Sequence, residues 1–204
     1  MKRGHWMKAG LVAIMVTSGA CSARAAEPAP LTPQQQAAMA EAMKRGAPGE
    51  AHLALEPFAG KWTNKVLFWM KPEDKVQKSE GTSENTWILG GRFLKQDYHG
   101  TTADGKPFDG IGITGYDNVK GEYQSIWIDN MMTGIMMATG AVDPGSKAIK
   151  LSGTFSCPMT GEKTRWYRDE WKMVDGDHYL FTSYAKGPDG KEFRSLEITA
   201  TRVK

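Results

Sequence analysis

The sequence predicts an all-β fold: a lipocalin-like antiparallel barrel of about ten strands, preceded by one or two short helices. From Gly60 onward, short segments alternate apolar and polar residues, as strands with one buried face do. Compact turn sequences separate these segments, and no helical stretch intervenes to build parallel βαβ units. Closing such a meander into a barrel removes its exposed edges.

The expected strands follow one another at short intervals, and the clearest strand–turn–strand pattern lies between Phe108 and Gly140. The strands are Lys61–Met70, Lys78–Leu89, Arg92–His99, Phe108–Tyr116, Glu122–Asn130, Thr133–Ala141, Ala148–Ser156, Thr164–Met173, His178–Tyr184 and Glu192–Val203. The turns between them contain Asp104-Gly105, Asp117-Asn118, Asp143-Pro144-Gly145, Asp175-Gly176 and Pro188-Asp189-Gly190. Each of these turn sequences favours a tight reversal of the chain.

The first 25 residues have the organisation of a secretory signal peptide. Lys2, Arg3 and Lys8 give a basic start, and the apolar run 11–16 is followed by small residues. This run is far shorter than the ~18 apolar residues that a membrane-spanning helix needs. We therefore expect a periplasmic or secreted protein with no integral membrane span.

Two processing routes are compatible with the end of this segment. Ala23-Arg24-Ala25 fits a small-x-small site, with cleavage before Ala26. Lipidation of Cys21 is the alternative, but Ser18 occupies the position where lipoprotein sites usually carry leucine. The cleaved, exported form is the favoured interpretation.

Processing changes the charge of the protein. The formal net charge of the whole chain is +3, but Lys2, Arg3, Lys8 and Arg24 lie in the expected signal peptide, which contains no acid. Their removal leaves 22 basic and 23 acidic residues. A near-neutral domain has no electrostatic footprint for nucleic acid, so no nucleic-acid partner is expected. Cleavage also leaves Cys157 as the remaining cysteine, which excludes an internal disulfide.

The sequence divides into three parts. These are the signal peptide 1–25, a linker with an N-terminal helix 26–47, and the barrel domain 48–204. Thr32, Pro33 and Gln35 form a helix-start signal, and Gly46 is a stop signal. A second short helical stretch is expected over Glu50–Phe58.

The two ends of the barrel sequence carry a matching pair of residues. Gly60-Lys61-Trp62 opens the first expected strand, and Arg202 lies on the last one. In lipocalin-like barrels a Gly-x-Trp at the first strand is covered by an arginine from the end of the chain. A guanidinium over an indole face is a favourable cation–π contact. We expect Trp62 and Arg202 to connect the first and last strands and to close one end of the barrel.

Many segments of the chain resemble the bacterial family DUF1579. They are Pro48-Gly49 with His52 and Leu55, Gly60–Trp62, Ile88–Leu94, Phe108–Gly112, Gly115–Asn118, Trp127–Met131, Thr133-Gly134, Leu196–Ile198 and Thr201-Arg202. The resemblance covers the chain from Pro48 to the C-terminus and implies a lipocalin-like barrel. The chain departs from the family pattern at Ala200, where tyrosine is expected, and at Ser156-Cys157-Pro158, where an acid–proline turn is expected. The activity of the family is unassigned, so the resemblance implies no chemistry.

Arg92 is the first candidate for ligand binding. It follows Gly90-Gly91, which allow a sharp turn or a close backbone approach at the start of a strand. One interpretation places Arg92 inside the barrel, where it would bind a carboxylate or phosphate. The other pairs it with Glu197 on the last strand, and this is favoured because an unpaired buried arginine is costly.

A second candidate is one face of the segment around Trp127. Tyr123, Ser125, Trp127 and Asp129 occupy alternate positions and therefore share one face of a strand. If Trp127 faces the interior, the others face it too, which gives an apolar barrel with a few polar groups, as small-molecule sites have. The alternative is that Tyr123 and Trp127 fill the barrel and Asp129 caps the following turn.

The sequence contains no recognisable metal or catalytic motif. His52, His99 and His178 are scattered, with no metal-ligand spacing. An axial haem ligand would have to be His52 or His178, and neither lies in a pattern that favours this role, so no cofactor is expected. There is no Gly-x-Ser-x-Gly elbow, and the glycines in 110–112 lie within a strand pattern rather than before a helix.

These observations favour an exported protein that binds a small hydrophobic or amphipathic molecule inside the barrel. Aromatic walls would supply affinity, and Arg92, Asp129 and Asn130 would orient a polar end. One alternative is an enzyme that uses Asp129 or Glu197 as a general base. The other is a structural or interaction module with a filled barrel and an exposed apolar patch.

Overall fold

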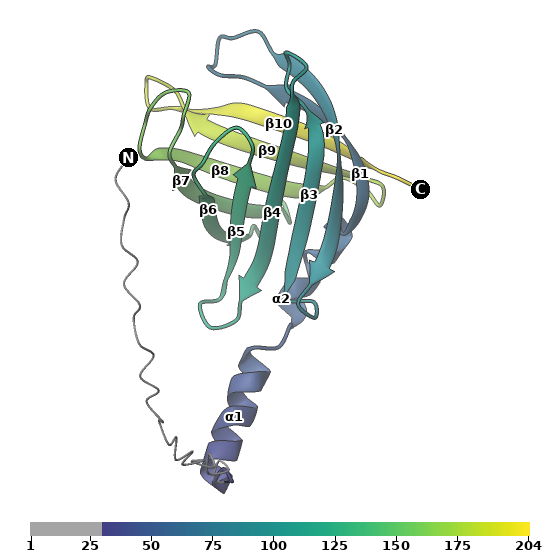
Figure 1. Ribbon diagram of the computed structural model, residues 1–204, viewed down its shortest axis with the longest axis vertical. Coiled ribbons are helices and arrows are strands. Elements are labelled where there is room, and N and C mark those ends of the chain that lie inside the picture. The colour runs from purple at the N-terminus through teal and green to yellow at the C-terminus, as the bar shows by residue number, and fades with distance from the viewer. Residues whose placement is uncertain (1–29) are drawn as a thin grey trace, which may run out of the picture.

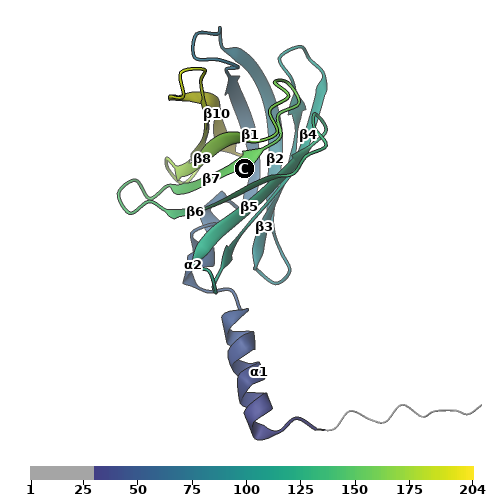
Figure 2. The same cartoon turned by 90° about the vertical axis from the view of Figure 1, so that its left-hand side faces the viewer.

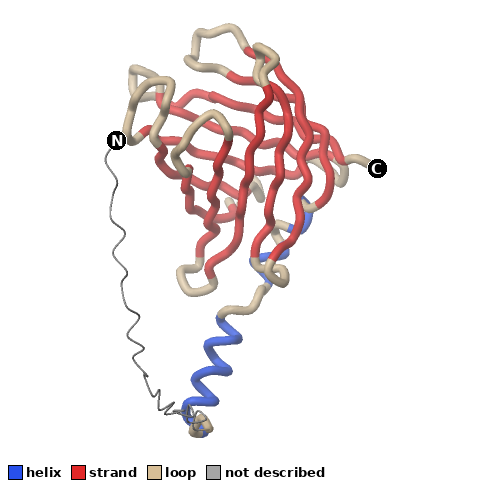
Figure 3. The backbone as a smooth tube through the Cα atoms, in the orientation of Figure 1, coloured by secondary structure: helices blue, strands red, loops and turns tan. Residues whose placement is uncertain are grey.

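The structure is a closed ten-stranded antiparallel β-barrel, described here by a computed structural model that covers residues 30–204 (Figures 1 and 3). The predicted fold class is therefore confirmed. The strands are β1 (Gly60–Phe68), β2 (Gln77–Ile88), β3 (Phe93–Thr101), β4 (Pro107–Asp117), β5 (Glu122–Asp129), β6 (Met136–Val142), β7 (Ile149–Phe155), β8 (Arg165–Met173), β9 (His178–Lys186) and β10 (Glu192–Arg202). The expected signal peptide lies outside the described residues.

The barrel is a simple meander in which each strand pairs with the next one in sequence. The first and last strands then pair with each other, with Trp62 opposite Arg202 and Phe68 opposite Leu196. The strand predictions are correct to within a few residues. The largest difference is at β6, which begins at Met136 rather than Thr133, because the segment after Asp129 forms a wide turn.

The turn between β2 and β3 explains the glycine pair in the sequence. Gly90 and Gly91 have φ angles of +68° and +80°, in the left-handed region that glycine adopts without steric cost. Leu89 precedes them with a φ of 49°. The turn is therefore built from three successive residues with positive φ, which reverses the chain sharply before β3.

Helix α1 (Pro33–Arg45) forms where the capping signals predict it. Thr32 and Gln35 form a reciprocal capping box, and the backbone N–H of Gly46 closes the helix by donating to Ala42 O. The helix buries none of its residues and projects away from the barrel (Figures 1 and 2). None of the described helices is long and apolar enough to cross a bilayer.

A short helical segment plugs one end of the barrel. It consists of α2 (Glu50–Leu53) and the 3-10 turn η1 (Glu56–Phe58). Leu55 and Phe58 are 0% and 3% exposed and pack into the core cluster that also contains Trp62. This burial holds the segment in place, because removing such apolar surface from water is the main stabilising contribution in the core.

Arg202 fastens the plug to both ends of the barrel sequence. Its guanidinium carbon lies 4.1 Å from the centroid of the Trp62 ring. The same guanidinium donates to the carbonyl oxygens of Ala59 and Pro57, each at 2.8 Å, and to that of Gly176 at 3.1 Å. The Trp62–Arg202 stacking expected from the sequence is present, and the hydrogen bonds extend it to η1.

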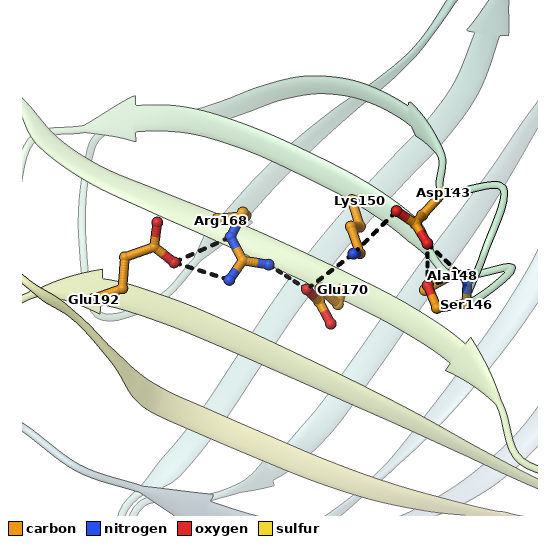
Figure 4. A network of polar contacts seen from close by, with 7 residues as sticks. All are labelled: Asp143, Ser146, Ala148, Lys150, Arg168, Glu170 and Glu192. Carbon is orange, nitrogen blue, oxygen red and sulfur yellow. Dashed lines mark hydrogen bonds and ion pairs between the residues drawn. The ribbon is translucent and has the colours of Figure 1, made fainter.

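A chain of charged residues crosses the outside of the barrel (Figure 4). Arg168 on β8 pairs with Glu170 and with Glu192, the latter at 2.9 Å. Lys150 on β7 lies 3.8 Å from Glu170 and 3.3 Å from Asp143. These contacts connect β7, β8 and β10 through side chains that point away from the interior.

Candidate functional site

The register of the strands determines which side chains face the interior. Trp127 on β5 is paired with Gly112 on β4 and with Met136 on β6. Its ring contacts Tyr98 and Phe108, with centroid separations of 6.4 Å in both cases. Ile128 points outward and is 39% exposed. The face that contains Tyr123, Ser125, Trp127 and Asp129 is therefore the inner face of β5.

Glycines on the neighbouring strand make room for the Trp127 indole. A Cβ atom on Gly110 would lie 2.2 Å from Cζ2 of Trp127, and one on Gly112 would lie 3.3 Å from its Cε3. Tyr98 lies in a similar way over Gly81, where a Cβ would be 2.3 Å from the Tyr98 hydroxyl. These glycines thus allow flat aromatic rings to lie against the inner wall.

Asp129 and Asn130 are held by their neighbours in the chain. Asp129 Oδ2 accepts from Trp127 Nε1 at 2.8 Å, and its Oδ1 accepts from the backbone N–H of Met131 at 2.9 Å. Asn130 accepts from the Asp109 N–H and donates to Pro107 O, both at 3.2 Å, and the residue is exposed. Asp129 orients the indole and caps the turn, while Asn130 ties this turn to β4.

The two other predicted positions on β5 contact opposite parts of the barrel. Ser125 shares a hydrogen bond of 2.9 Å with Thr114 on β4 and is half-buried. Tyr123 donates from its hydroxyl to Ala51 O at 2.6 Å, which ties β5 to the plug. Burial raises the pKa of Tyr123, so the phenol stays neutral and serves as a donor. Ser125 is the residue of the two that faces the middle of the barrel.

Arg92 lies at the plugged end and binds the end of α1. Its Nε donates to Gly46 O at 3.0 Å and its Nη1 donates to Leu89 O at 3.1 Å. Asn118 in the β4–β5 turn assists it, because its Nδ2 donates to Arg45 O and Ala47 O, both at 2.8 Å. Arg92 and Asn118 thus satisfy carbonyl groups that a helix C-terminus leaves unpaired.

Glu197 lies on the outer face of β10, where it pairs with Arg194. The guanidinium of Arg194 also lies 4.7 Å from the ring centroid of Trp69. The Arg92–Glu197 ion pair expected from the sequence is therefore not formed. Successive residues of a strand face opposite sides of the sheet, so a shift of one residue decides whether a side chain lies inside. Leu196 and Ile198 face the interior, and Glu197 between them faces outward.

A second carboxyl group on the inner face, which the sequence did not indicate, belongs to Asp169. Asp169 on β8 is paired with Leu151 on β7 and Ser183 on β9, and all three face inward. The residue as a whole keeps partial exposure, but its Oδ1 is inaccessible to solvent and has no hydrogen-bond partner among the described residues. Burial raises the pKa of Asp169 to about 7, while a hydrogen bond from Ser183 and the charge of Arg168 oppose the shift.

A second group of polar side chains in the interior lies on β1 and β2. Asn64 Nδ2 donates to Ser83 Oγ at 3.1 Å, and Asn85 Nδ2 donates to Phe58 O at 2.8 Å. Both amides are 2% exposed, and the oxygen of each has no partner among the described residues. Buried polar groups usually have a hydrogen-bond partner, so these two amide oxygens are exceptions. They make this part of the interior polar.

Inward-facing aromatic residues lie along the whole barrel, and their burial varies at both ends. At the plugged end, Trp62 and Tyr179 are 0% and 2% exposed, whereas Trp87 and Trp171 are half-buried. Towards the other end, Tyr98 and Tyr167 are buried, whereas the following aromatic residues are half-buried: Phe68, Phe108, Trp127 and Phe155. These four side chains therefore keep partial exposure.

Two open grooves lie at the plugged end of the barrel. One has a volume of about 380 Å³ and is lined in part by Arg45, Arg92 and Asn118. The other, of about 490 Å³, is lined in part by Pro48, Leu53 and Trp87. Arg92 and Asn118 bind carbonyl groups at the end of α1, and the Trp87 indole donates to Glu56 in the plug.

Each histidine within residues 30–204 has a hydrogen-bond partner. His52 Nδ1 accepts from the Gly49 N–H at 3.0 Å, and burial lowers the pKa of His52, which keeps the ring neutral. His178 and His99 lie 2.8 Å and 2.7 Å from the carboxylates of Asp175 and Asp109. Within residues 30–204, no group of three potential metal ligands comes together.

Solved structures share the barrel fold at low sequence identity. One is the crystal structure of Rv2717c from M. tuberculosis, at 17% identity and a TM-score of 0.58, covering 78% of this chain and 100% of the other. Another is the S-type phycobiliprotein lyase CPES from Guillardia theta, at 9% identity and a TM-score of 0.53, covering 77% and 99%. At these identities the similarity supports the fold alone.

Comparison at the level of families gives a firmer relationship. No curated protein matches the chain. The family model described as "Protein of unknown function (DUF1579)" matches residues 47–202, which is the whole barrel with its plug and most of the chain. The chain belongs to the DUF1579 family.

Proposed function

We propose that this protein binds a small, largely apolar molecule inside the barrel. The observation that carries the proposal is the aromatic inner wall of β3 to β5, where the rings of Tyr98, Phe108 and Trp127 lie together and the latter two keep partial exposure. An apolar wall with a few polar groups is typical of small-molecule sites. Gly110 and Gly112 leave room for the Trp127 indole against the inner wall.

The predicted site residues contribute in two ways. Trp127 and Ser125 would contact the ligand from the inner face of β5, with Asp129 holding the indole. Tyr123, Arg92 and Asn130 would act indirectly, because their polar groups are engaged by the plug, by the end of α1 and by β4.

Filling the interior tests this proposal. Phenylalanine at Ser125 would occupy the space beside Trp127, whereas phenylalanine at Gln124, the preceding outward-facing residue, would not. We expect the neutral apolar fluorophore Prodan to bind the wild-type protein and the Gln124→Phe variant with one site. The Ser125→Phe variant should bind it at least tenfold more weakly while it unfolds at a similar temperature.

Equal binding by the two variants would place the fluorophore elsewhere, and absence of binding to the wild-type protein would contradict the proposal. Native mass spectrometry of protein incubated with a periplasmic extract then identifies the mass of a retained natural ligand.

We also propose that the protein is exported and acts outside the cytoplasm. The support is the basic, apolar and small-residue order of positions 1–25. Mass spectrometry of the protein isolated from the cell envelope is expected to find an N-terminal peptide that begins at Ala26. A lipid-modified peptide beginning at Cys21, abolished by Cys21→Ser, would establish the alternative route.

A further inference from the structure

The Asp169 carboxyl lies on the inner wall of β8. Its sequence neighbours Arg168 and Glu170 point outward and belong to the ionic chain on the barrel surface (Figure 4). Tyr167 and Trp171, two residues away on either side, share its inward face and its wall. Asp169 is therefore flanked by aromatic rings and separated by the sheet from the charges that surround it in the sequence.

The fold leaves this carboxyl incompletely satisfied. Ser183 is the side chain that hydrogen-bonds it, and Arg168, the cation whose charge reaches it, is already bound by Glu170 and Glu192. Its Oδ1 has no partner among the described residues. A buried acceptor without a partner is costly, and a bound donor would remove that cost.

The other unsatisfied groups of the interior are also acceptors. Asn85 donates from Nδ2 to Phe58 O, and this contact fixes the amide so that the unpaired atom is the oxygen. Asn64 Oδ1 is also unpaired. Among the described residues, each buried side-chain polar atom that lacks a partner is therefore an oxygen that accepts hydrogen bonds. A complementary ligand would supply donors.

We propose that Asp169 binds an amine group of the ligand, so that the ligand class is an apolar molecule, aromatic or aliphatic, that carries a primary or secondary amine. This inference rests on the proposed function, because it requires a ligand inside the barrel. An ammonium group supplies both the missing donor and the missing positive charge, and charge-assisted hydrogen bonds are the strong ones.

A matched pair of probes separates this inference from the proposed function. The probes are 1-naphthylmethylamine and 1-methylnaphthalene, which share the apolar body and differ in the amine. By calorimetry, the wild-type protein is expected to bind the amine at least tenfold more tightly. Asp169→Asn should abolish this preference and retain 1-methylnaphthalene binding. Glu170→Gln, which removes a carboxylate from the outer face of the same strand, should keep the preference.

The outcomes are distinguishable. If neither probe binds to folded wild-type protein, the proposed function fails. If 1-methylnaphthalene binds as tightly as the amine, or if Asp169→Asn keeps the preference, the amine site is overturned while binding inside the barrel survives.

A measurement on the wild-type protein covers the case in which Asp169→Asn does not fold. At pH 6 the amine is charged, and its binding should release a proton from the Asp169 carboxyl, detected by calorimetry in buffers of different ionisation heat. Tyr167 on β8 is the other ionisable group beside it, and burial, together with the Asp169 charge, raises the pKa of Tyr167 far above this range. Binding of 1-methylnaphthalene should release none, and proton release that is equal for both probes overturns the inference.

Discussion

The Trp127 indole lies so close to Gly110 that a Cβ atom on that glycine would be 2.2 Å from the ring. The packing of the flat Trp127 ring against a glycine on the neighbouring strand therefore determines the shape of this part of the interior wall. Gly110 is required here for space, since its backbone does not lie in the left-handed region.

We expect Gly110→Ala to lower the free energy of unfolding by about 1–3 kcal/mol, the usual cost of overpacking. The methyl group would force the indole off the wall and break its 2.8 Å hydrogen bond to Asp129. Urea denaturation measures the loss, with Gly176→Ala as control, because a Cβ on Gly176 meets nothing within 4 Å. Equal effects of the two substitutions would contradict the assigned packing.

The Asp169 carboxyl should give the protein an unusual dependence of stability on pH. Its pKa is raised from 3.8 to about 7 in the folded state, so the folded protein holds a proton that the unfolded chain releases above pH 4. The free energy of unfolding should therefore fall as pH rises from about 4 to about 7. A shift of three units corresponds to at most about 4 kcal/mol.

The comparison with Asp169→Asn isolates this contribution. Denaturation at pH 4.5, 6 and 7.5 should find the variant gaining stability relative to the wild-type protein as pH rises. Acids with lowered pKa, such as Asp104 and Glu162, act in the opposite direction and at lower pH, and they cancel in the difference. A difference that does not change with pH would contradict the burial of this carboxyl.

The arginine at the end of β10 should be essential to barrel closure. Arg202→Ala removes the cation over Trp62 and three hydrogen bonds to carbonyl groups, so we expect a loss of about 2–4 kcal/mol. Arg202→Lys should recover little, because an ammonium cannot reproduce the planar guanidinium geometry. Thermal and urea unfolding provide the measurement.

Arg194→Ala is the matched control for this prediction. Arg194 also lies over a tryptophan and pairs with an acid, but on the outer surface of the same strand. Such exposed contacts contribute about 0–1 kcal/mol. If the two alanine variants lose equal stability, the closing role of Arg202 is wrong.

The attachment of α1 should depend on donors from the barrel rather than on side chains of the helix. Asn118→Ala removes both hydrogen bonds to Arg45 O and Ala47 O, while α1 buries no residue of its own. We expect faster hydrogen exchange in the last turn of α1 and less than about 1 kcal/mol change in stability. Val119→Ala, at a neighbouring position that is 80% exposed, should leave the exchange unchanged; equal exchange in both variants would contradict the attachment.

The sequence predicted the barrel well because strand alternation and turn residues are local signals. The inner face of β5 followed from the same signal, since Trp127 decides it for its neighbours at every second position. The role of Arg92 was harder to predict, because its partners are backbone carbonyl groups at a helix end, which no pattern of side chains indicates. The orientation of Glu197 could be predicted only with the register of β10 known to the exact residue.

Asp169 was missed although the local signal for it exists. Tyr167, Asp169 and Trp171 alternate, which places the acid on the aromatic face of its strand. Because Arg168 and Glu170 on either side are also charged, the sequence suggests that all three residues are exposed to solvent. Only the pairing with Leu151 and Ser183 shows that the acid, rather than its neighbours, lies inside.

The closure of the barrel by Arg202 has a consequence for how the protein matures. The carbonyl of Ala59 and the guanidinium that binds it are 143 positions apart, near the two limits of the domain. The first strand therefore lacks its second partner until almost the entire chain has been synthesised. A product truncated before β10, which begins at Glu192, would retain unpaired edges on β1 and β9, the kind of surface on which chaperones and proteases act.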